Sequence, residues 1–234
     1  MSVAVDSELQ RLARLLRCRT RDLDFLGRFA AAEIRALRLA VFARLYADHE
    51  TTYSRIASAS RLLPVKVTAP LAQRRLPARV SAGVVASLPP DAAAAMSARM
   101  SADYVADVSG FLHPVLSAPV LSRFPVDVIL RVAAVLADRE DYDTMAEVVS
   151  ALSDEQVAAV IDAIEDPAVL VQVALRVTDP DALQHLTGVI PEARLREMVV
   201  WARRRTRLWP ELVALLGRLP ATQRKRLLSA ARAS

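Results

Sequence analysis

Apolar residues recur at spacings of three and four along most of the chain, which is the period of an amphipathic helix. The clearest run passes through Leu23, Leu26, Ala30, Ile34, Leu37, Val41 and Leu45. This spacing predicts one long helix of about seven turns. A second apolar line widens its buried face and comprises Phe25, Phe29, Leu39, Phe42 and Tyr46. We expect a shorter helix from about Ser7 to Arg17 to form a hairpin with it, and a third helix to end before Pro64.

Proline marks most of the expected helix starts after residue 65. Because its missing N–H costs nothing in a first turn, starts are predicted at Pro70, Pro89 or Pro90, Pro125, Pro167, Pro180, Pro191, Pro210 and Pro220. Ser153 followed by Gln156 is a capping-box pattern at the one start without a proline. The segments between these starts are short, which predicts short antiparallel helices.

Five of the starts form a repeat in which a large apolar residue precedes the helix opener. They are Leu88-Pro89, Phe124-Pro125, Leu152-Ser153, Ile190-Pro191 and Leu219-Pro220. Repeats that cannot bury their own apolar faces must stack on their neighbours. The fold class predicted is all-α: an N-terminal helical module over residues 1–65 with one long helix, then a right-handed α-solenoid of short helices over residues 66–234.

The segments LPPDAAAAMSARM, ALSDEQVAAVIDAIEDPAVLVQVAL and VIPEARLREMVV carry a family resemblance. They resemble the tandem helical repeats of the cytosolic N-terminal domain of MgtE-type magnesium transporters, over roughly residues 80–231. The resemblance implies a superhelical regulatory and interaction module. No CBS pair or membrane channel follows in this chain, so we expect neither transport nor the magnesium sensing that depends on those parts.

Composition limits the class of protein further. The 234 residues are 53% hydrophobic and 24% charged, which suits a folded chain with a sizeable core. The longest stretch without a charged side chain covers residues 108–122, too short to span a membrane, and the first residues lack the apolar core of a secretion signal. The single cysteine, Cys18, excludes an intramolecular disulfide. These features predict a cytoplasmic protein. Asparagine is absent and Lys66 and Lys225 are the only lysines, which is typical of a GC-rich bacterial genome.

Charge is distributed in blocks. Residues 1–80 carry a net charge of +8, residues 81–200 carry −11 and residues 201–234 carry +8. Such blocks indicate that acidic and basic surfaces meet within the molecule or in an oligomer, or that the basic ends meet an anionic partner. We favour the first interpretation.

Candidate chemistry is sparse. The densest carboxylate group, Asp138, Glu140, Asp141 and Asp143, is a weak candidate for a Mg²⁺ or Ca²⁺ site. Asp141 or Asp143 as a helix N-cap explains at least one of these acids, and the others favour the positive start of a helix. His49, His113 and His185 lack zinc spacing; His113 is expected at a helix C-terminus and His185 as a half-buried helix residue. Cys18 lies between two arginines, which favours its thiolate, but a turn residue is the simpler interpretation.

Anion binding has one clear candidate segment. It interleaves Trp201 and Trp209 with Arg203, Arg204, Arg205 and Arg207, a mixture that binds phosphates by charge and bases by stacking. Arginine at a helix C-terminus is the alternative explanation. The isolated glycines form no phosphate-binding loop.

These features predict a non-enzymatic interaction or scaffold module that presents its helical-repeat surface to another protein. We expect no catalytic residues and no cofactor. The alternatives are an anion-binding protein for nucleic acid or an acidic membrane surface, and a small-ligand carrier or enzyme with a pocket among the helices. A homodimer through the Leu23–Leu45 helix is a further expectation.

Overall fold

The computed structural model describes residues 2–206 and 208–225, and every regular element in them is helical. The first helices are α1 (Val3–Leu16), the 3₁₀ helix η1 (Thr20–Arg28), α2 (Ala31–Ala47) and α3 (Glu50–Ser60). They are followed by α4 (Val65–Arg75), α5 (Ala78–Ala86), α6 (Pro90–Ser97), α7 (Ala102–Ser109), α8 (Pro114–Leu121) and α9 (Val126–Asp138). The remainder are α10 (Tyr142–Val148), η2 (Val149–Ala151), α11 (Asp154–Ala163), α12 (Pro167–Arg176), α13 (Pro180–Val189), α14 (Glu192–Arg203) and α15 (Leu208–Gly217). The all-α class predicted from the sequence is confirmed.

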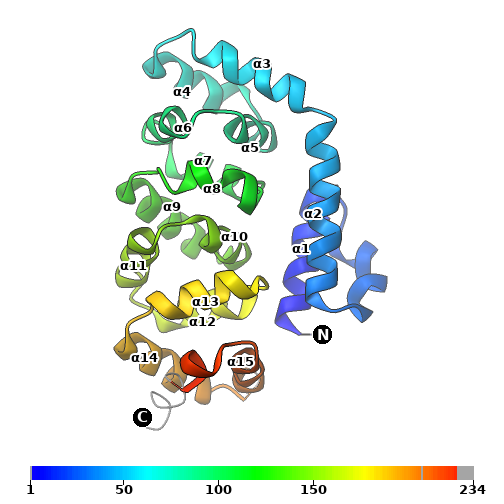
Figure 1. Cartoon of the computed structure of the whole chain (residues 1–234), viewed down its shortest axis with the longest axis vertical. Helices are drawn as coiled ribbons and strands as arrows, with labels where there is room; N and C mark the ends of the chain where they lie inside the picture. The colour runs from blue at the N-terminus through cyan, green and yellow to red at the C-terminus, as the bar shows by residue number, and fades with distance from the viewer. Residues whose placement is uncertain (1, 207, 226–234) are drawn as a thin grey trace.

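Helices α3 to α15 form one elongated stack (Figure 1). Each helix packs mainly on the second helix along the chain, as α5 does on α3 and α7, and α12 does on α10 and α14. The main hydrophobic core runs through the stack from Tyr53 to Leu219. Helix α3, which the sequence groups with residues 1–65, contributes Tyr53 and Ala57 to this core.

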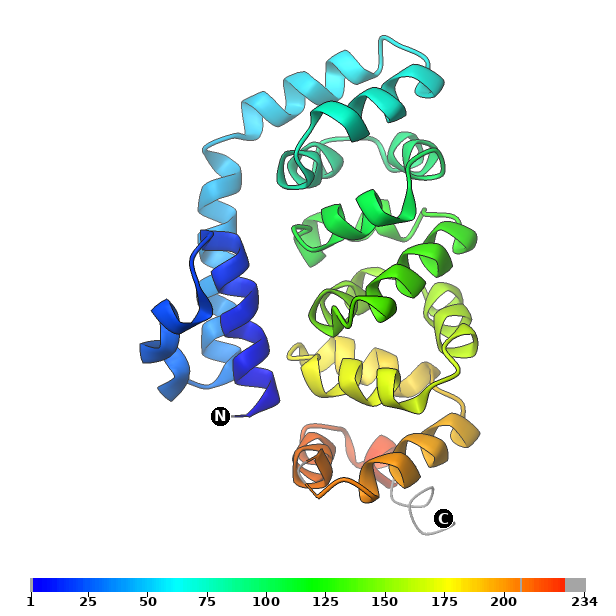
Figure 2. The ribbon, with the colours of Figure 1, turned by 180° about the vertical axis from the view of Figure 1, so that it is seen from behind.

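Helices α1 and α2, here called the N-terminal pair, lie along one side of the stack with their axes parallel to its length (Figures 1 and 2). A small core of their own holds the pair and η1 together and includes Leu9, Leu12 and Ile34. The two helices run in the same direction, because η1 returns the chain to the start of α2 (Figure 2). The predicted antiparallel hairpin is therefore wrong.

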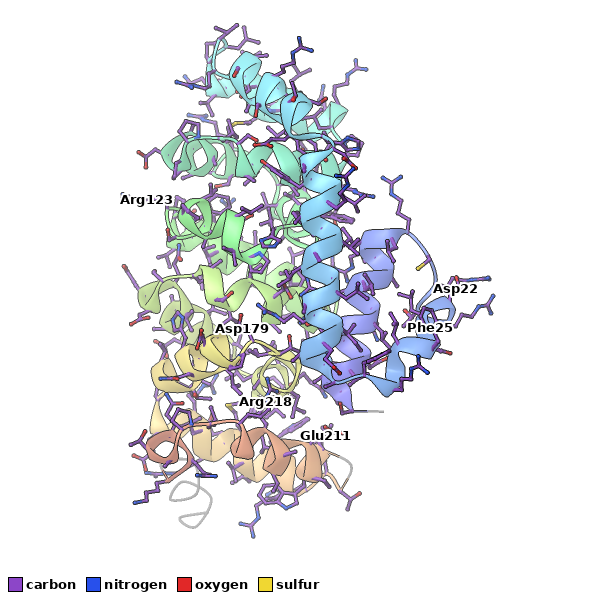
Figure 3. The ribbon with its side chains drawn as sticks, turned by 45° about the vertical axis from the view of Figure 1, so that its right-hand side comes forward. Asp22, Phe25, Arg123, Asp179, Glu211 and Arg218 are labelled. Atoms are coloured by element: carbon purple, nitrogen blue, oxygen red, sulfur yellow. The ribbon has the colours of Figure 1, made fainter. Side chains whose placement is uncertain are left out.

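The predicted helix from Leu23 to Leu45 is also interrupted. Residues 20–28 form η1, and α2 begins only at Ala31. Ala30 is the N-cap of α2, and its backbone N–H donates to the carboxylate of Glu33 at 2.8 Å. Only Leu23 and Leu26 of the apolar stripe lie in η1, and their spacing of three residues fits a 3₁₀ helix as well as an α-helix, so the pattern did not reveal the break. Phe25 and Phe29 are exposed rather than buried, and Figure 3 shows Phe25 at the outer edge of η1.

Most of the predicted helix starts are confirmed. Pro90, Pro167 and Pro180 occupy first-turn positions, while Pro89, Pro125 and Pro191 are N-caps. Ser153 and Gln156 form the predicted capping box, with N–H···O distances of 2.8 and 3.3 Å. The apolar residues before the caps are buried at Leu88, Phe124, Ile190 and Leu219 and half-buried at Leu152. Buried pre-cap residues fix the angle at which the chain enters each helix.

Pro70 is the exception among these starts. It lies inside α4, whose N-cap is Pro64. Pro70 is solvent-exposed, so water can satisfy the backbone carbonyl that loses its helical donor there. Pro210 lies in the first turn of α15, where the missing N–H is tolerated. Of the helices in the described ranges, none is both long enough and apolar enough to cross a membrane.

Candidate functional site

A buried group of charges joins the N-terminal pair to the stack. Glu8 of α1 is fully buried, and its carboxylate accepts hydrogen bonds from Arg11 at 2.8 Å, Arg38 at 2.8 Å and the hydroxyl of Thr178 at 2.6 Å. Glu147 of α10 lies 3.0 Å from the guanidinium groups of both Arg11 and Arg38. Two acidic and two basic side chains therefore neutralise each other where water is excluded.

Further hydrogen bonds and ion pairs surround these four charged side chains. Arg11 also donates to the backbone carbonyls of Asp143 and Arg176, at 2.9 and 3.1 Å. Arg14 donates to Thr144 at 2.7 Å and to the carboxylate of Asp141 at 3.2 Å. Arginines of α1 and α2 thus meet acids of residues 81–200 within the molecule, as the favoured interpretation of the charge blocks predicts for this part of the chain.

Helix α2 contacts successive levels of the stack with one face. From its start to its end, Arg35 pairs with Asp179, Arg38 with Glu147, Phe42 packs against the ring of His113 and Tyr46 hydrogen-bonds Ser87. These positions are three or four residues apart, so they form one line along the helix. The predicted apolar stripe is not this line: Ile34 is buried, but Leu37 is exposed.

The charge group controls protonation of its members. Burial alone would raise the pKa of Glu8, but Arg38 and Arg11 outweigh it and hold the pKa of this carboxyl below its usual range. Burial likewise opposes the charge on Arg38, yet Glu147 and Glu8 raise the pKa of its guanidinium. Burial also opposes ionisation of Asp141, but Arg14 lowers the pKa of that carboxyl. All three groups are charged at neutral pH, and the arrangement serves cohesion rather than proton transfer.

The four acids proposed as weak metal ligands are not brought together. Asp141 is the N-cap of α10, as predicted, and accepts from the Thr144 N–H at 3.1 Å. Asp143 is buried beside Arg11 and Arg176, whereas Asp138 and Glu140 are exposed. Over the parts of the chain that the structure describes, His, Cys, Asp and Glu side chains form no group of three or more that suits a metal ion.

The histidines have structural contacts. His113 is the N-cap of α8 and not a C-terminal residue, because its ring Nδ1 accepts from the Leu116 N–H at 3.3 Å. Burial and the nearby Arg38 lower the pKa of His113, so the ring is neutral and able to accept. His185 is half-buried, as predicted, and its Nε2 lies 2.9 Å from Asp154.

Cys18 occupies the turn after α1, where its backbone N–H donates to the Ala13 carbonyl at 3.1 Å. The preceding residue, Arg17, has a left-handed backbone with φ of 58°. Together they end the helix in a Schellman-type turn. This is the turn position predicted for the cysteine.

The predicted anion-binding segment is folded onto itself. The guanidinium of Arg205 lies 3.5 Å from the centre of the Trp201 ring, and that of Arg203 lies 5.9 Å from the Trp209 ring. Each arginine thus covers one face of a tryptophan ring, and a nucleic-acid base would need that face for stacking. Arg204 is exposed, and Arg207 lies outside the described residues.

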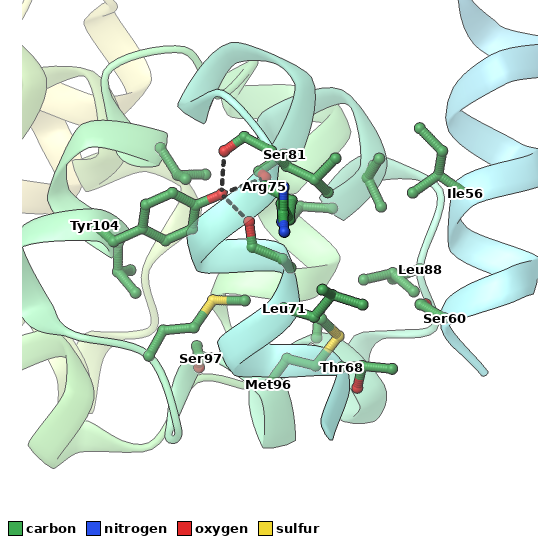
Figure 4. A pocket seen from close by; sticks show the side chains of 18 of the residues that line it. Ile56, Ser60, Thr68, Leu71, Arg75, Ser81, Leu88, Met96, Ser97 and Tyr104 are labelled. Atoms are coloured by element: carbon green, nitrogen blue, oxygen red, sulfur yellow. Dashed lines mark hydrogen bonds between the residues drawn. The ribbon is translucent and has the colours of Figure 1, made fainter. Parts of the chain in front are cut away.

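A cavity of about 350 Å³ lies at the other end of the stack, among α3, α4, α5, α6 and α7. Its wall is almost entirely apolar and includes Ile56, Leu71, Leu88, Met96 and Val105. Figure 4 shows these helices surrounding the space, with Met96 and Leu71 on one side and Tyr104 on another. Binding pockets for small molecules start at about this size and have mainly apolar walls.

Polar groups in the cavity wall are already satisfied. The Tyr104 hydroxyl lies 2.6 Å from that of Ser81 and 2.9 Å from the Leu76 carbonyl, and burial raises the pKa of this phenol. The hydroxyls of Ser97 and Ser109 each donate to a carbonyl of their own helix at 2.8 Å. Few donors or acceptors are left to hold water, so the interior favours an apolar occupant.

The cavity has a charged residue at its edge and borders a second void inside the stack. Arg75 is the one cation in its wall; it is exposed and, among the described residues, has no acidic partner within 4 Å. A second void of about 70 Å³ shares Val105, Ser109 and Phe124 with the first and continues toward α9 to α12. The apolar space therefore runs from a charged edge into the stack.

No family model, curated protein or solved structure matches the chain. The resemblance to the magnesium-transporter domain therefore stays a prediction. The sequence analysis named a pocket among the helices only in general terms and identified none of its residues. One signal was present: Ser, Ala and Gly predominate in residues 81–97, where Val84, Val85, Leu88 and Met96 are the only larger apolar side chains besides proline, and small residues leave space where helices cross.

Proposed function

We propose that the chain binds an apolar or amphiphilic small molecule in the cavity between α3 and α7. The observation that carries the proposal is the cavity itself, about 350 Å³ with an apolar wall whose hydroxyl groups are internally hydrogen-bonded. Maintaining such a void costs packing energy, which a bound ligand recovers. The chain then functions as a carrier, with no catalytic step.

A single-chain lipid with an anionic head is the ligand class that fits best. Its hydrocarbon tail would lie along Leu88, Met96 and Val105, while its head would meet Arg75 at the edge. Each buried methylene is worth about 0.8 kcal/mol, or roughly a fourfold gain in affinity. We expect affinity for fatty acids to rise with chain length and then stop rising once the tail fills the cavity.

Calorimetric titration with monomeric fatty acids of increasing length tests the proposal. The Val84→Phe variant fills the cavity, because Val84 is a buried residue of its wall. We expect at least a tenfold loss of affinity in this variant. The matched control is Val115→Phe, the same change at an exposed residue of α8 away from the cavity. Equal affinities in the two variants would contradict the proposal.

The interaction or scaffold module expected from the sequence is the second candidate. Its support is the elongated helical stack, which offers a long surface to another protein (Figure 2). This candidate includes three further predictions from the sequence: the stack is a right-handed solenoid, the protein is cytoplasmic, and it forms a homodimer. A pull-down at high salt tests the partner, and light scattering tests the dimer: a monomer mass at every concentration would eliminate it.

A further inference from the structure

The end of the stack next to the cavity is unusually basic. Residues 51–90 contain six bases and no Asp or Glu: Arg55, Arg61, Lys66, Arg74, Arg75 and Arg79. All are exposed except Arg79, which is half-buried. Within residues 2–206 and 208–225, no carboxylate lies within 4 Å of any of them. Their charge is therefore available to an anionic partner.

Exposed apolar side chains lie among these bases. Leu62 is 84% exposed, and Leu63, Val67 and Leu71 are about half exposed. Leu62 and Leu63 lie in the turn between α3 and α4, and Val67 and Leu71 lie in α4. Leu63 and Leu71 are also part of the cavity wall. A mixed surface of leucines and bases thus surrounds the edge of an apolar cavity.

The position of this surface leaves it accessible. The turn between α3 and α4 is at the extreme end of the stack, away from the N-terminal pair and the C-terminal helices (Figures 1 and 2). A flat surface can therefore approach it without meeting other elements. Apolar side chains beside bases are the combination that holds a peripheral protein at an anionic lipid surface.

We propose that the basic tip, defined as residues 61–75, docks on an anionic lipid bilayer and opens the cavity toward it. The leucines enter the boundary between headgroups and acyl chains, while the bases lie among the lipid phosphates. A lipid tail then passes between bilayer and cavity without crossing water. The second part of this inference rests on the proposed function; the docking itself does not.

Co-sedimentation with vesicles tests the docking. The probes are vesicles of phosphatidylcholine with about one-third phosphatidylglycerol, and vesicles of phosphatidylcholine alone. We expect binding only to the first, weakening as salt rises, because charge contributes about fivefold in affinity for each base near the surface. Absence of binding to the anionic vesicles would overturn the proposal, as would equal binding to both.

Paired variants locate the docking surface. Arg61→Gln with Lys66→Gln is expected to weaken binding to the anionic vesicles about 25-fold, and Leu62→Ser with Val67→Ser to weaken it at least tenfold. The matched controls are Arg204→Gln with Arg205→Gln, and Val115→Ser, all at exposed residues far from the tip. Loss of binding in the Arg204/Arg205 control alone would overturn the proposal in favour of the C-terminal segment. Tighter binding to DNA than to vesicles in the same salt would overturn it in favour of nucleic acid.

The two proposals fail separately. The Val84→Phe variant is expected to lose its affinity for monomeric fatty acid but still to bind vesicles, since Val84 is buried away from the tip surface. The tip variants are expected to keep the affinity for monomeric fatty acid but to take it up from anionic vesicles at least tenfold more slowly. Normal vesicle binding without any fatty-acid binding would sustain the docking and refute the carrier. Normal uptake rates in the tip variants would refute the role of the tip in transfer.

Discussion

Two regions inside this molecule lie between packed helices and differ in what fills them. Where the N-terminal pair meets the stack, Glu8, Arg11, Arg38 and Glu147 are packed together and neutralise one another. Between α3 and α7, apolar walls surround open space. Charges that pair with one another hold a fixed geometry, whereas an open apolar space is available to a ligand. The comparison separates the part that maintains the shape from the part that binds.

The basic side chains of the two regions also differ in their partners. At the N-terminal pair, Arg11, Arg14, Arg35 and Arg38 each have a carboxylate partner. At the basic tip, no base has one among the described residues. Composition alone treats these arginines as one class. The structure separates those that neutralise internal acids from those that present charge to the outside.

Among changes to the first region, removal of the Glu8 carboxylate is expected to lower the free energy of unfolding most. Glu8→Gln leaves Arg11 and Arg38 buried with one carboxylate fewer, and breaking a buried pair costs about 3–5 kcal/mol. We expect urea unfolding to show a loss of this size. Arg139→Gln is the control, since Arg139 pairs with Asp103 and Asp107 at the surface, where solvent screens ion pairs and they contribute little to stability. Similar losses in both variants would show that burial adds nothing to the pairing.

Lowering the pH tests the stability of the same region without a mutation. The pKa values of Glu8 and Asp141 are lowered in the folded protein, so the unfolded chain takes up protons first as the pH falls. Their stabilisation is complete above the unfolded values, roughly 4, and is lost as the pH drops through the lower folded values. We expect the urea midpoint to change little from pH 7 to 5 and to decline steeply below about 4.5.

Asp141→Asn is the control for this acid dependence. Asparagine keeps the N-cap of α10 but does not titrate, so the decline below pH 4.5 is expected to be shallower in the variant. An unchanged slope would exclude Asp141 from the acid response.

A smaller effect is expected at the cavity end. A Cβ added at Gly83 of α5 would lie 2.5 Å from the ring of Tyr53 on α3. Gly83→Ala therefore forces α3 away from α5, and overpacking of this kind costs about 1–3 kcal/mol. Gly188→Ala is the control, because its Cβ has no neighbour closer than 3.7 Å and alanine favours a helix by up to about 1 kcal/mol. Thermal unfolding measures both, and stabilisation by both would mean that α3 has room to move.

The sequence predicted the helices of the stack better than the N-terminal pair, for a local reason. Pro167, Pro180 and the Ser153–Gln156 pair act on the turn that contains them, so their effect is visible in a short stretch. The break before α2 depends on Ala30, whose side chain has no capping atom and gives no signal. The counts favoured pairing between the charge blocks, in one molecule or in an oligomer, but which arginines pair and with which acids depends on the packing of distant helices.

The cavity could not be predicted because it is an absence of atoms between helices. Leu88, Met96 and Val105 have the pattern of ordinary core residues, and only the separation of the helices determines that they surround a space. The sequence placed the anion-binding candidate at Trp201 to Arg207 instead, since clustered arginine and tryptophan are conspicuous. The structure shows that Arg203 and Arg205 lie over those tryptophans.

The position of the N-terminal pair has a consequence for how the chain folds. The stack grows by contacts between near neighbours, which form quickly and in order as the polypeptide emerges. Arg11 and Arg38, by contrast, find Glu147 only after more than a hundred further residues have been synthesised. We therefore expect the docking of the first helices made to be a late step of folding. Until it occurs, Glu8 has Arg11 and Arg38 beside it within the N-terminal pair, but these three side chains lack Glu147 and Thr178 and remain open to water.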